Sequence, residues 1–417
     1  MERVPIAIVG CGGMGGRHLW GLQELYTSGM SNVELVAACD LRRDNAEYLA
    51  DNAERLLGTR PAVFTEMEAM VRAIPDLQAV DVTTDSGSHH RVVSAALDLG
   101  LHIQCEKPLA STVRGCNLLI ARHAGTDRVL SVAEQFRRDP ICRLTRAVLD
   151  AGAIGEPRML IEVSAGGGDR IIIFPWRHVK EIGGIFVDAG VHNVDLMQYY
   201  LGPVREVYAR AAIMEPVRYR VQGNTTVSGF YEHWYQEMPE SMEATAEDTV
   251  IATLDFERGA MGHWTSFQAA HGDAYSQAVI HGAAGSLRLA GARNGRPVTV
   301  TLDDGGTVPA ERVLDLVPDF GLDGITAALF GGERLASYPF SFPEADRKLV
   351  AVEYHELGEC ILGDRRPEVD AFTSRGSLAV CHAALESSLL HRPVTVEEIV
   401  QERTAQYEQS ILAHWGL

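Results

Sequence analysis

Near its start the chain reads Val4-Pro5-Ile6-Ala7-Ile8-Val9 and then Gly10-Cys11-Gly12-Gly13-Met14-Gly15. The first run is short, apolar and rich in β-branched residues, which is typical of a buried strand. The second run matches the pattern GxGxxG, and a helix-like stretch to about Leu25 follows it. A second apolar strand is predicted over residues 33–39 and ends next to Asp40. Strand, glycine turn, helix, strand and acid in this order are typical of a dinucleotide-binding unit.

The glycines of this turn have separate tasks. Gly10 permits the tight turn, Gly12 lets the backbone approach a pyrophosphate, and Gly15 lets the helix pack closely on the strand. The helix N-terminus then offers N–H groups and a positive dipole end to the phosphates. We therefore expect this turn, including Gly13 and Met14, to bind a dinucleotide. The alternative, an ordinary strand-to-helix turn, fits the surrounding pattern less well.

The acid after the second strand indicates which dinucleotide is bound. Asp40 can accept hydrogen bonds from ribose hydroxyls and would repel the additional phosphate of NADP. Arg42 and Arg43 follow it closely and could bind that phosphate, or they could simply be solvated residues at the start of a helix. The sequence therefore favours NAD as the cofactor and leaves NADP as the less favoured alternative.

Length, charge and cysteine usage disfavour several classes of protein. The 417 residues predict two or three domains with a large core. A net charge of −19 disfavours binding to nucleic acid or to a membrane surface, because both need a basic face. We find no apolar run of about eighteen residues and no signal-peptide pattern. The seven cysteines are scattered without a CxxC pair, so we expect reduced thiols and a cytoplasmic protein.

Strands and helices alternate up to about residue 133. Further strands are expected over 62–64, 79–83, 101–105 and 129–133, with helices to about residue 57, over 66–73 and over 90–99. This order predicts an α/β fold, a Rossmann-type doubly wound parallel sheet over residues 1–133 that binds NAD(P) at the carboxyl ends of its strands.

Residues 134–417 show a different pattern, which predicts an α+β domain for substrate binding and oligomerisation. After a helix over 143–151, strands are expected over 158–165, 205–214, 248–256, 260–267, 276–281, 286–289 and 298–302. They predict a large, open, mostly antiparallel sheet, whose free face is either solvated or the interface of a homo-oligomer, a dimer or a tetramer. Helices over 345–362, 374–390 and 396–415 end the chain and could pack back on the Rossmann domain.

The segment 216–247 has little clear periodicity, and it is rich in aromatic residues, namely Tyr219, Phe230, Tyr231, Trp234 and Tyr235. It is either a loop that shapes or covers the active site, or a loop packed on its own protein or on a neighbouring subunit. The sequence does not favour one of these interpretations over the other.

A charged pair follows one of the predicted parallel strands, in the run from Cys105 to Pro108. At the carboxyl end of such a strand we expect Glu106 and Lys107 to face the ligand crevice and its cofactor rather than the core. Lys107 could donate a hydrogen bond to a substrate hydroxyl. The alternative is a surface ion pair between Lys107 and Glu106.

A polar loop follows the strand over 79–83. This loop can line the nicotinamide side of a cofactor, so Thr83 and Thr84 are expected to bind it. His89, at the end of the loop, is also a candidate for cofactor binding. For His89 we favour a structural or supporting role over a catalytic one.

A third motif runs from Gly183 to Asp195 and places a carboxylate and an imidazole on one helix. Asp188 and His192 are four residues apart and therefore share a helix face. Such a pair suits acid–base work near neutral pH, because the acid orients the ring and raises its proton affinity. The alternative is a capped helix with a structural histidine. Further ligands at a zinc spacing are missing, so we expect no metal.

The three motifs, over residues 10–15, 105–108 and 183–195, resemble those of the glucose-fructose oxidoreductase / inositol dehydrogenase / rhizopine catabolism (Gfo/Idh/MocA) superfamily. The resemblance covers nearly the whole chain and implies NAD(P)-dependent oxidation or reduction of a sugar, cyclitol or related polyol. It implies catalytic roles for Lys107, Asp188 and His192. The substrate-binding residues that it implies are Lys107, Arg137, Trp176, Arg177, Asp188 and His192.

Three functions are compatible with these residues. The first is hydride transfer between NAD and a secondary hydroxyl of a sugar, glycoside or cyclitol, in which His192 takes the hydroxyl proton and Lys107 polarises the oxygen. The second is an NAD-retaining enzyme that oxidises the sugar transiently for glycosidic cleavage or epimerisation. The third is a non-catalytic NAD(H)-binding regulator, against which the intact set of Lys107, Asp188 and His192 argues.

Overall fold

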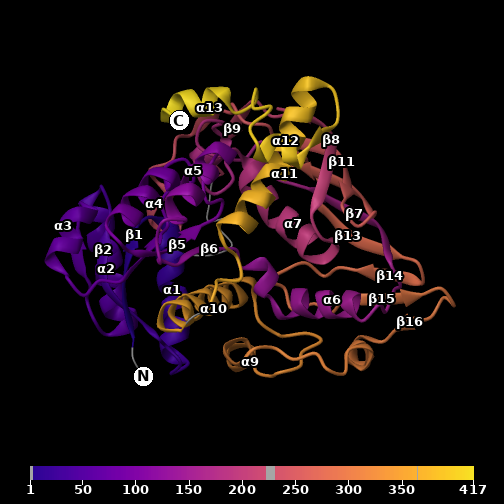
Figure 1. Ribbon diagram of the computed structural model, residues 1–417, viewed down its shortest axis with the longest axis horizontal. Helices are drawn as coiled ribbons and strands as arrows, with labels where there is room; N and C mark the ends of the chain where they lie inside the picture. Colours follow the sequence, from indigo (N-terminus) through magenta and orange to yellow (C-terminus); the bar gives the residue numbers. More distant parts are fainter. Residues whose placement is uncertain (1–2, 222–230, 364) are drawn as a thin grey trace. The chain divides into compact units, whose positions relative to one another are not determined.

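The computed structural model describes residues 3–221, 231–363 and 365–417, which form two compact units (Figure 1). The described residues of 3–135, 231–238 and 346–375 form one unit, which we call the N-terminal unit. The described residues of 136–221, 239–345 and 376–417 form the other, which we call the sheet unit. The chain therefore passes between the two units several times.

In the part of the chain that the structure describes, six strands of the N-terminal unit form a parallel sheet in the order β3-β2-β1-β4-β5-β6. Their bounds are β1 Val4–Val9, β2 Val33–Cys39, β3 Ala62–Phe64, β4 Ala79–Val82, β5 His102–Glu106 and β6 Leu130–Ala133. The strand order reverses between β1 and β4, which is where such sheets bind dinucleotides. The predicted Rossmann sheet is confirmed.

The helices of this unit connect the strands in the alternating order that the sequence predicts. They are α1 (Gly13–Thr27), α2 (Arg43–Leu57), α3 (Met67–Ala73), α4 (His89–Asp98) and α5 (Val113–His123). Helix α1 packs against α2, and α4 packs against α5. Helix α5 has no counterpart among the expected helices, although it has a capping signal, because the Thr112 side chain accepts the N–H of Gly115.

A helix from the C-terminal part of the chain completes the N-terminal unit. Helix α10 (Phe342–Leu362) enters this unit at Asp346 and packs on α1 at very close range. A Cβ atom added to Gly21 of α1 would lie 2.4 Å from Cγ1 of Val350, a distance at which one of the two helices would have to shift. The close approach therefore depends on a glycine at position 21.

Among the described residues of the sheet unit, nine strands form a sheet in the order β16-β15-β14-β13-β7-β12-β11-β8-β17. Their bounds are β7 Pro157–Ala165, β8 Val204–Ala212, β11 Thr249–Phe256, β12 Met261–Phe267, β13 Tyr275–Gly282, β14 Gly285–Arg288, β15 Thr299–Leu302, β16 Thr307–Val308 and β17 Val394–Thr395. The pairs are antiparallel except for β7 with β12, which run parallel. The predicted large, mostly antiparallel sheet is confirmed.

The two faces of this sheet differ. On one face Trp264 is fully buried, and Gly190 of α7 (Ile185–Leu201) lies so close that an added Cβ would be 3.1 Å from its ring. The other face exposes large apolar side chains on four strands, and each of them is about half accessible to solvent. They are Tyr208, Ile251, Met261 and Tyr275.

The remaining helices of the sheet unit include one difference from the sequence prediction. They are α6 (Pro140–Asp150), α9 (Gly324–Phe330), most of α11 (Ala371–Leu390), α12 (Val396–Val400) and α13 (Gln409–Trp415). The single helix expected over 396–415 is therefore wrong, because two short helices, α12 and α13, stand in its place. The cause is Glu386, whose carboxylate accepts the backbone N–H groups of Gln406 and Tyr407 at 2.9 and 2.7 Å. Because these N–H groups bind a side chain, they cannot continue a helix.

The close contact of α1 with α10 yields a stability prediction. Replacing Gly21 with Ala should lower the thermal unfolding temperature, because an overpacked core typically costs about 1–3 kcal/mol, more than the helix gains from alanine. The matched control is Gly324→Ala at the start of α9, where an added Cβ has nothing within 4 Å. Equal unfolding temperatures for the two variants, measured by circular dichroism, would contradict the tight packing.

Candidate active site

The glycine turn at the end of β1 has the geometry that a pyrophosphate requires. Gly10 has φ = 101°, and a Cβ there would lie 2.6 Å from the backbone nitrogen of Thr84. A Cβ on Gly15 would lie 2.4 Å from the carbonyl oxygen of Gly10. Gly12 caps α1 and has nothing within 4 Å of an added Cβ, so the backbone before Gly13 and Met14 is open. This open backbone at a helix N-terminus fits the phosphates of a dinucleotide.

Asp40 lies at the carboxyl end of β2, where an acid binds the adenosine ribose. Its Oδ2 accepts the backbone N–H of Cys11 at 2.7 Å, and its Oδ1 accepts the N–H of Arg42 at 2.8 Å. These bonds orient the carboxylate next to the glycine turn. Each oxygen keeps a second lone pair for a ribose hydroxyl.

The loop after β4 is tied to the turn and to the neighbouring strand end. Thr83 Oγ1 donates to the carbonyl oxygen of Gly10 at 2.6 Å. His89 is buried, and its Nδ1 and Nε2 contact the carbonyl oxygens of Pro108 and Thr84 at 2.8 and 3.1 Å. His89 thus holds the loop that contains Thr84 against the strand end that bears Lys107, which agrees with a supporting role.

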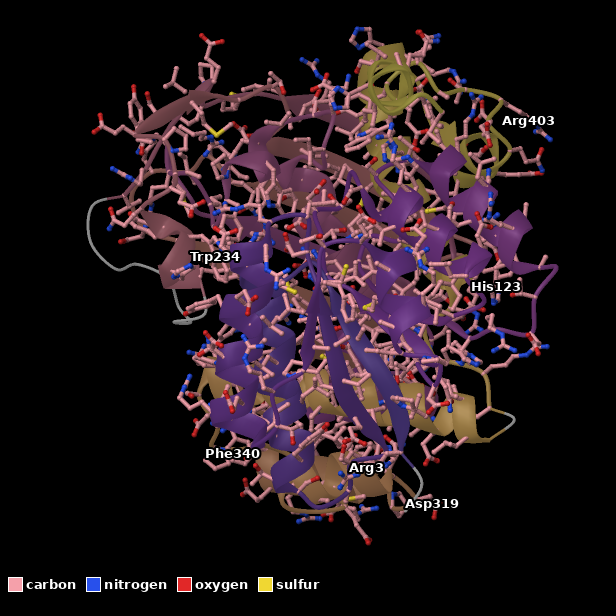
Figure 2. All side chains as sticks on the ribbon, turned by 90° about the vertical axis from the view of Figure 1, so that its left-hand side faces the viewer. Arg3, His123, Trp234, Asp319, Phe340 and Arg403 are labelled. Atoms are coloured by element: carbon pink, nitrogen blue, oxygen red, sulfur yellow. The ribbon has the colours of Figure 1, made fainter. Side chains whose placement is uncertain are left out.

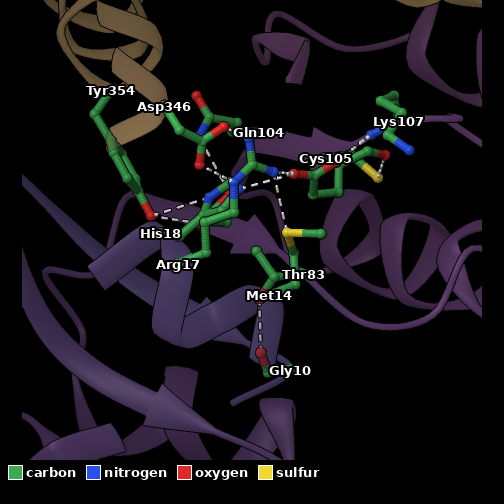
Figure 3. A network of polar contacts seen from close by, with 12 residues as sticks. Gly10, Met14, Arg17, His18, Thr83, Gln104, Cys105, Lys107, Asp346 and Tyr354 are labelled. Carbon is green, nitrogen blue, oxygen red and sulfur yellow. Dashed lines mark hydrogen bonds and ion pairs between the residues drawn. The ribbon is translucent and has the colours of Figure 1, made fainter. Parts of the chain in front are cut away.

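A buried cluster of charged residues lies beside Lys107, and Figure 3 shows it from close by. Glu106 Oε1 binds Arg17 Nη1 at 3.1 Å and His18 Nε2 at 3.0 Å. Glu106 Oε2 accepts the backbone N–H of Lys107 at 3.0 Å. The carboxylate of Glu106 is therefore buried against two cations that α1 supplies, and its contact with a cofactor stays a prediction. Lys107 itself is 6% exposed, which excludes the alternative of a surface ion pair.

Two further carboxylates complete this cluster. Asp81 of β4 binds Nδ1 of His18 at 2.8 Å, and the hydroxyl of Tyr354 donates to the same carboxylate. Asp346 binds Arg17 through Nε at 2.6 Å and Nη2 at 2.8 Å. Figure 3 shows Asp346 and Tyr354 approaching from α10. Three carboxylates, those of Asp81, Glu106 and Asp346, thus bind the cations of Arg17 and His18.

The charge on His18 follows from these neighbours. Burial opposes a charged imidazole, but the carboxylates of Asp81 and Glu106 outweigh it and raise the pKa of His18 to about 10. Burial likewise opposes the charge on Glu106, but His18 and Arg17 hold the pKa of that carboxyl well below its usual range. His18 is therefore an imidazolium and Glu106 a carboxylate at neutral pH.

In the sheet unit, the motif over 183–195 forms the start of α7. Gly184 precedes the helix with φ = 69°, and Asp188 lies in the first turn, where a carboxylate interacts favourably with the helix dipole. Arg177 Nη2 binds Asp188 Oδ2 at 2.6 Å, and the Arg177 guanidinium lies 5.6 Å from the Trp176 ring centroid. The structure therefore brings three predicted substrate-binding residues together at one helix end.

His192 lies one turn further along α7 and stacks on an aromatic ring. Its imidazole is parallel to the ring of Phe136, with centroids 4.1 Å apart and an interplanar angle of 3°. The guanidinium of Arg293 lies 4.5 Å from the Phe136 centroid and 4.5 Å from that of Phe342. The stacked rings restrict the orientation of the imidazole.

Arg137 contacts the same helix. Its Nε binds Asp195 Oδ2 at 2.7 Å, and its guanidinium lies 5.1 Å from the Tyr199 ring centroid. The structure thus places Gly10, Gly12, Gly13, Met14, Gly15, Asp40, Thr83, Thr84, His89, Glu106 and Lys107 in the N-terminal unit, and Arg137, Trp176, Arg177, Asp188 and His192 in the sheet unit.

Sequence reasoning missed several residues around these sites. Arg17 and His18 follow the glycine turn, but their partners Asp81 and Glu106 lie 63 to 89 positions away, so no local pattern indicates them. Glu162 of β7 was also missed. Its partner in the register of the adjacent strand β12 is Trp264, so both side chains lie on the face that α7 covers. Burial raises the pKa of Glu162 to about 7. An acid within the apolar run from Met159 to Val163 is the signal that could have indicated it.

Within residues 3–221, 231–363 and 365–417, no group of three or more His, Cys, Asp or Glu side chains could hold a metal ion. Over the same residues, no helix is long and apolar enough to cross a bilayer.

The fold and the nucleotide site define the chain as an NAD-binding oxidoreductase. Residues 4–134 match the family model described as "Oxidoreductase family, NAD-binding Rossmann fold", and residues 142–288 match the "GFO/IDH/MocA C-terminal domain". The chain belongs to the Gfo/Idh/MocA family of oxidoreductases, as the three motifs indicate.

Two named relatives and one solved structure are similar to most of the chain. Myo-inositol 2-dehydrogenase of Thermotoga maritima is 23% identical over 398 residues, 95% of this chain and 99% of the relative. Levoglucosan dehydrogenase of Pseudarthrobacter phenanthrenivorans is 27% identical over 297 residues, 69% of this chain and 73% of the relative. A structure of levoglucosan dehydrogenase with NADH and L-sorbose shares the fold, with a TM-score of 0.74 at 21% identity, covering 96% of this chain and all of that one.

The buried imidazolium yields a prediction about pH and stability. The pKa of His18 is about 10 in the folded protein, above its ordinary value of 6.5. The charged ring therefore stabilises the fold fully below pH 6.5, and this contribution is lost as the pH rises from there to about 10. The difference in free energy of unfolding between wild type and His18→Gln should shrink across this window, by up to about 1.4 kcal/mol per pH unit.

Urea unfolding of both proteins at several pH values measures this difference. Urea is preferred to guanidinium chloride because salt would screen the charges under study. A difference that stays constant or grows with rising pH would contradict a charged His18 in the folded protein.

Proposed function

We propose that this protein transfers a hydride between NAD and a secondary hydroxyl of a sugar, glycoside or cyclitol. Two relatives that align with at least 69% of the chain are named as dehydrogenases of myo-inositol and levoglucosan, which supports this class of substrate. The observation that carries the proposal is the placement of Lys107. It is a buried lysine at the carboxyl end of β5, the sheet edge at which Rossmann folds bind their ligands.

The proposed reaction assigns one task to each of three side chains. Lys107 donates a hydrogen bond to the reacting oxygen and stabilises the negative charge that develops there during oxidation. His192 accepts the proton of that hydroxyl, and Asp188 supports its orientation and charge. The nicotinamide of bound NAD supplies the hydride acceptor. In the reverse direction His192 returns the proton and Lys107 polarises the carbonyl.

The proposed substrate contacts come from the start of α7 and its surroundings. Arg177 and Arg137 are positioned by Asp188 and Asp195, and both can donate hydrogen bonds to ring hydroxyls. Trp176 offers an aromatic face to the apolar side of a sugar ring. Ion pairs that hold both guanidiniums in advance lower the entropy cost of binding a polyol.

We also propose that two or four copies associate through the exposed face of the nine-stranded sheet. The apolar side chains on this face, which include Ile251 and Met261, are 51% and 58% exposed. Large apolar side chains that gather on one exposed face favour association between copies of a chain. A cytoplasmic location is proposed with it, because all seven cysteines are buried thiols and none forms a disulfide.

Lys107→Ala tests the proposed chemistry. A screen of inositols, aldoses and glycosides with NAD first identifies a substrate that is turned over. The variant should then lose roughly 10²- to 10⁴-fold in kcat, because it lacks the group that polarises the reacting oxygen. NADH binding, followed by fluorescence, should change little.

The matched control is Lys348→Ala on α10, which removes an ammonium group that pairs with Glu24 at 3.1 Å. This variant should retain nearly full turnover. Near-normal turnover of Lys107→Ala, or an equal loss in both variants, would contradict the role of Lys107.

The proposed interface is tested by Ile251→Glu. A buried charge at this position should dissociate the oligomer, which sedimentation velocity detects as a lower molecular mass. Leu118→Glu is the matched control, since Leu118 of α5 is 52% exposed, about as much as Ile251. A monomeric wild-type protein, or an Ile251→Glu variant with unchanged mass, would contradict association through this face.

A further inference from the structure

The described part of the aromatic segment packs on the nucleotide-binding fold of the same chain. Helix α8 (Glu232–Tyr235) and the residues to Met238 belong to the N-terminal unit, whereas β9 (Val217–Tyr219) and β10 (Ser241–Glu243), on either side of it in the sequence, belong to the sheet unit. Phe230, one of the aromatic residues of this segment, lies outside the described residues. The described part therefore supports packing on the chain's own protein.

Two contacts fix this segment on the first turns of α2. Trp234, labelled in Figure 2, is 7% exposed, and its Nε1 donates to Oδ1 of Asn45 at 3.1 Å. The ring of His233 stacks on Tyr48, with centroids 4.0 Å apart and planes 12° from parallel. Because Trp234 is buried and bonded, the residues one turn further along have a defined position.

Glu237 is placed by these anchors against Arg42. Its Oε2 binds Arg42 Nη1 at 2.7 Å, and its Oε1 binds Nη2 at 3.3 Å. Asp44 binds the same guanidinium from the other side, with Oδ2 2.7 Å from Nη2. Hydrogen bonds from Arg42 lower the pKa of both carboxyl groups, so both are ionised at neutral pH.

Arg42 lies where an arginine would decide the choice of cofactor. Its backbone N–H binds the carboxylate of Asp40, so its side chain begins beside the ribose-binding acid. In NADP-binding Rossmann folds, an arginine near this position accommodates the 2′-phosphate. Here the guanidinium is already bound by two carboxylates, and the three acids and one arginine of this corner carry a net charge of about −2.

We propose that Glu237 is a specificity-determining residue that excludes NADP, by holding the Arg42 guanidinium that would otherwise bind the 2′-phosphate. A 2′-phosphate would have to displace Glu237 and Asp44 from Arg42 and would also meet their negative charge. NAD has a free ribose hydroxyl instead, and it needs only Asp40. The proposal concerns cofactor choice and is independent of which polyol is the substrate.

The exposed ion pairs contribute to specificity more than to stability. The side chains of Arg42 and Glu237 are 50% and 51% exposed, and ion pairs with such exposure add little to the stability of a fold. Their effect on a competing anion is larger, because removing Glu237 leaves Arg42 with one carboxylate instead of two and also removes a repulsive charge. A selective effect on NADPH without a loss of stability is therefore expected.

The test is a fluorescence titration of the full-length protein with NADH and with NADPH, without any polyol. Glu237→Gln should bind NADPH roughly three- to tenfold more tightly than the wild type. Its affinity for NADH should stay within about twofold. Asp44→Asn should also bind NADPH more tightly than the wild type, and it provides a second variant if Glu237→Gln does not fold.

Two further variants separate this account from a general effect of charge. Asp51→Asn removes one negative charge from the same helix, but Asp51 binds Arg60 rather than Arg42, so the ratio of NADPH to NADH affinity should not change. Arg42→Ala combined with Glu237→Gln should abolish the gain. An unchanged ratio in Glu237→Gln, an equal gain in Asp51→Asn, or a gain that survives loss of Arg42 would overturn the proposal.

Discussion

The ion pair that the N-terminal unit depends on most is that of the His18 imidazolium with the carboxylates of Asp81 and Glu106. His18 comes from α1 directly after the glycine turn, and its partners come from β4 and β5, so one ring joins the phosphate-binding helix to the centre of the sheet. Were His18 neutral, two buried carboxylates would lack one of their cations, at a cost of several kcal/mol. The charge is therefore part of the fold.

The same cluster fixes the position of the Lys107 backbone, as the proposed role of Lys107 requires. Glu106 accepts the backbone N–H of Lys107 while Arg17 and His18 hold its carboxylate, so the strand end cannot rotate freely. Catalytic groups act best when rigid surroundings set their geometry before the substrate binds. In the sheet unit, the stacking of His192 on Phe136 and the pairing of Arg177 with Asp188 have a similar effect.

The features that follow from local sequence were predictable, and those that depend on distant partners were not. The glycine turn, the bounds of β1 and β2, and the shared helix of Asp188 and His192 follow from patterns within twenty residues. The burial of Glu106 depends on cations 88 and 89 positions away. The break between α12 and α13 depends on Glu386. The ion pair that fixes the Arg42 guanidinium depends on Glu237, 195 positions away. Periodicity does not encode such pairings.

The most direct test of the central claim is a crystal structure of the protein with NADH and a polyol that it turns over. The account predicts that Lys107 Nζ and a nitrogen of the His192 imidazole both lie within hydrogen-bond distance, about 2.6–3.2 Å, of the same substrate oxygen. The carbon that bears this oxygen should face the nicotinamide ring. A complex in which the two side chains contact different substrate atoms, or in which either points away from the polyol, would contradict the account.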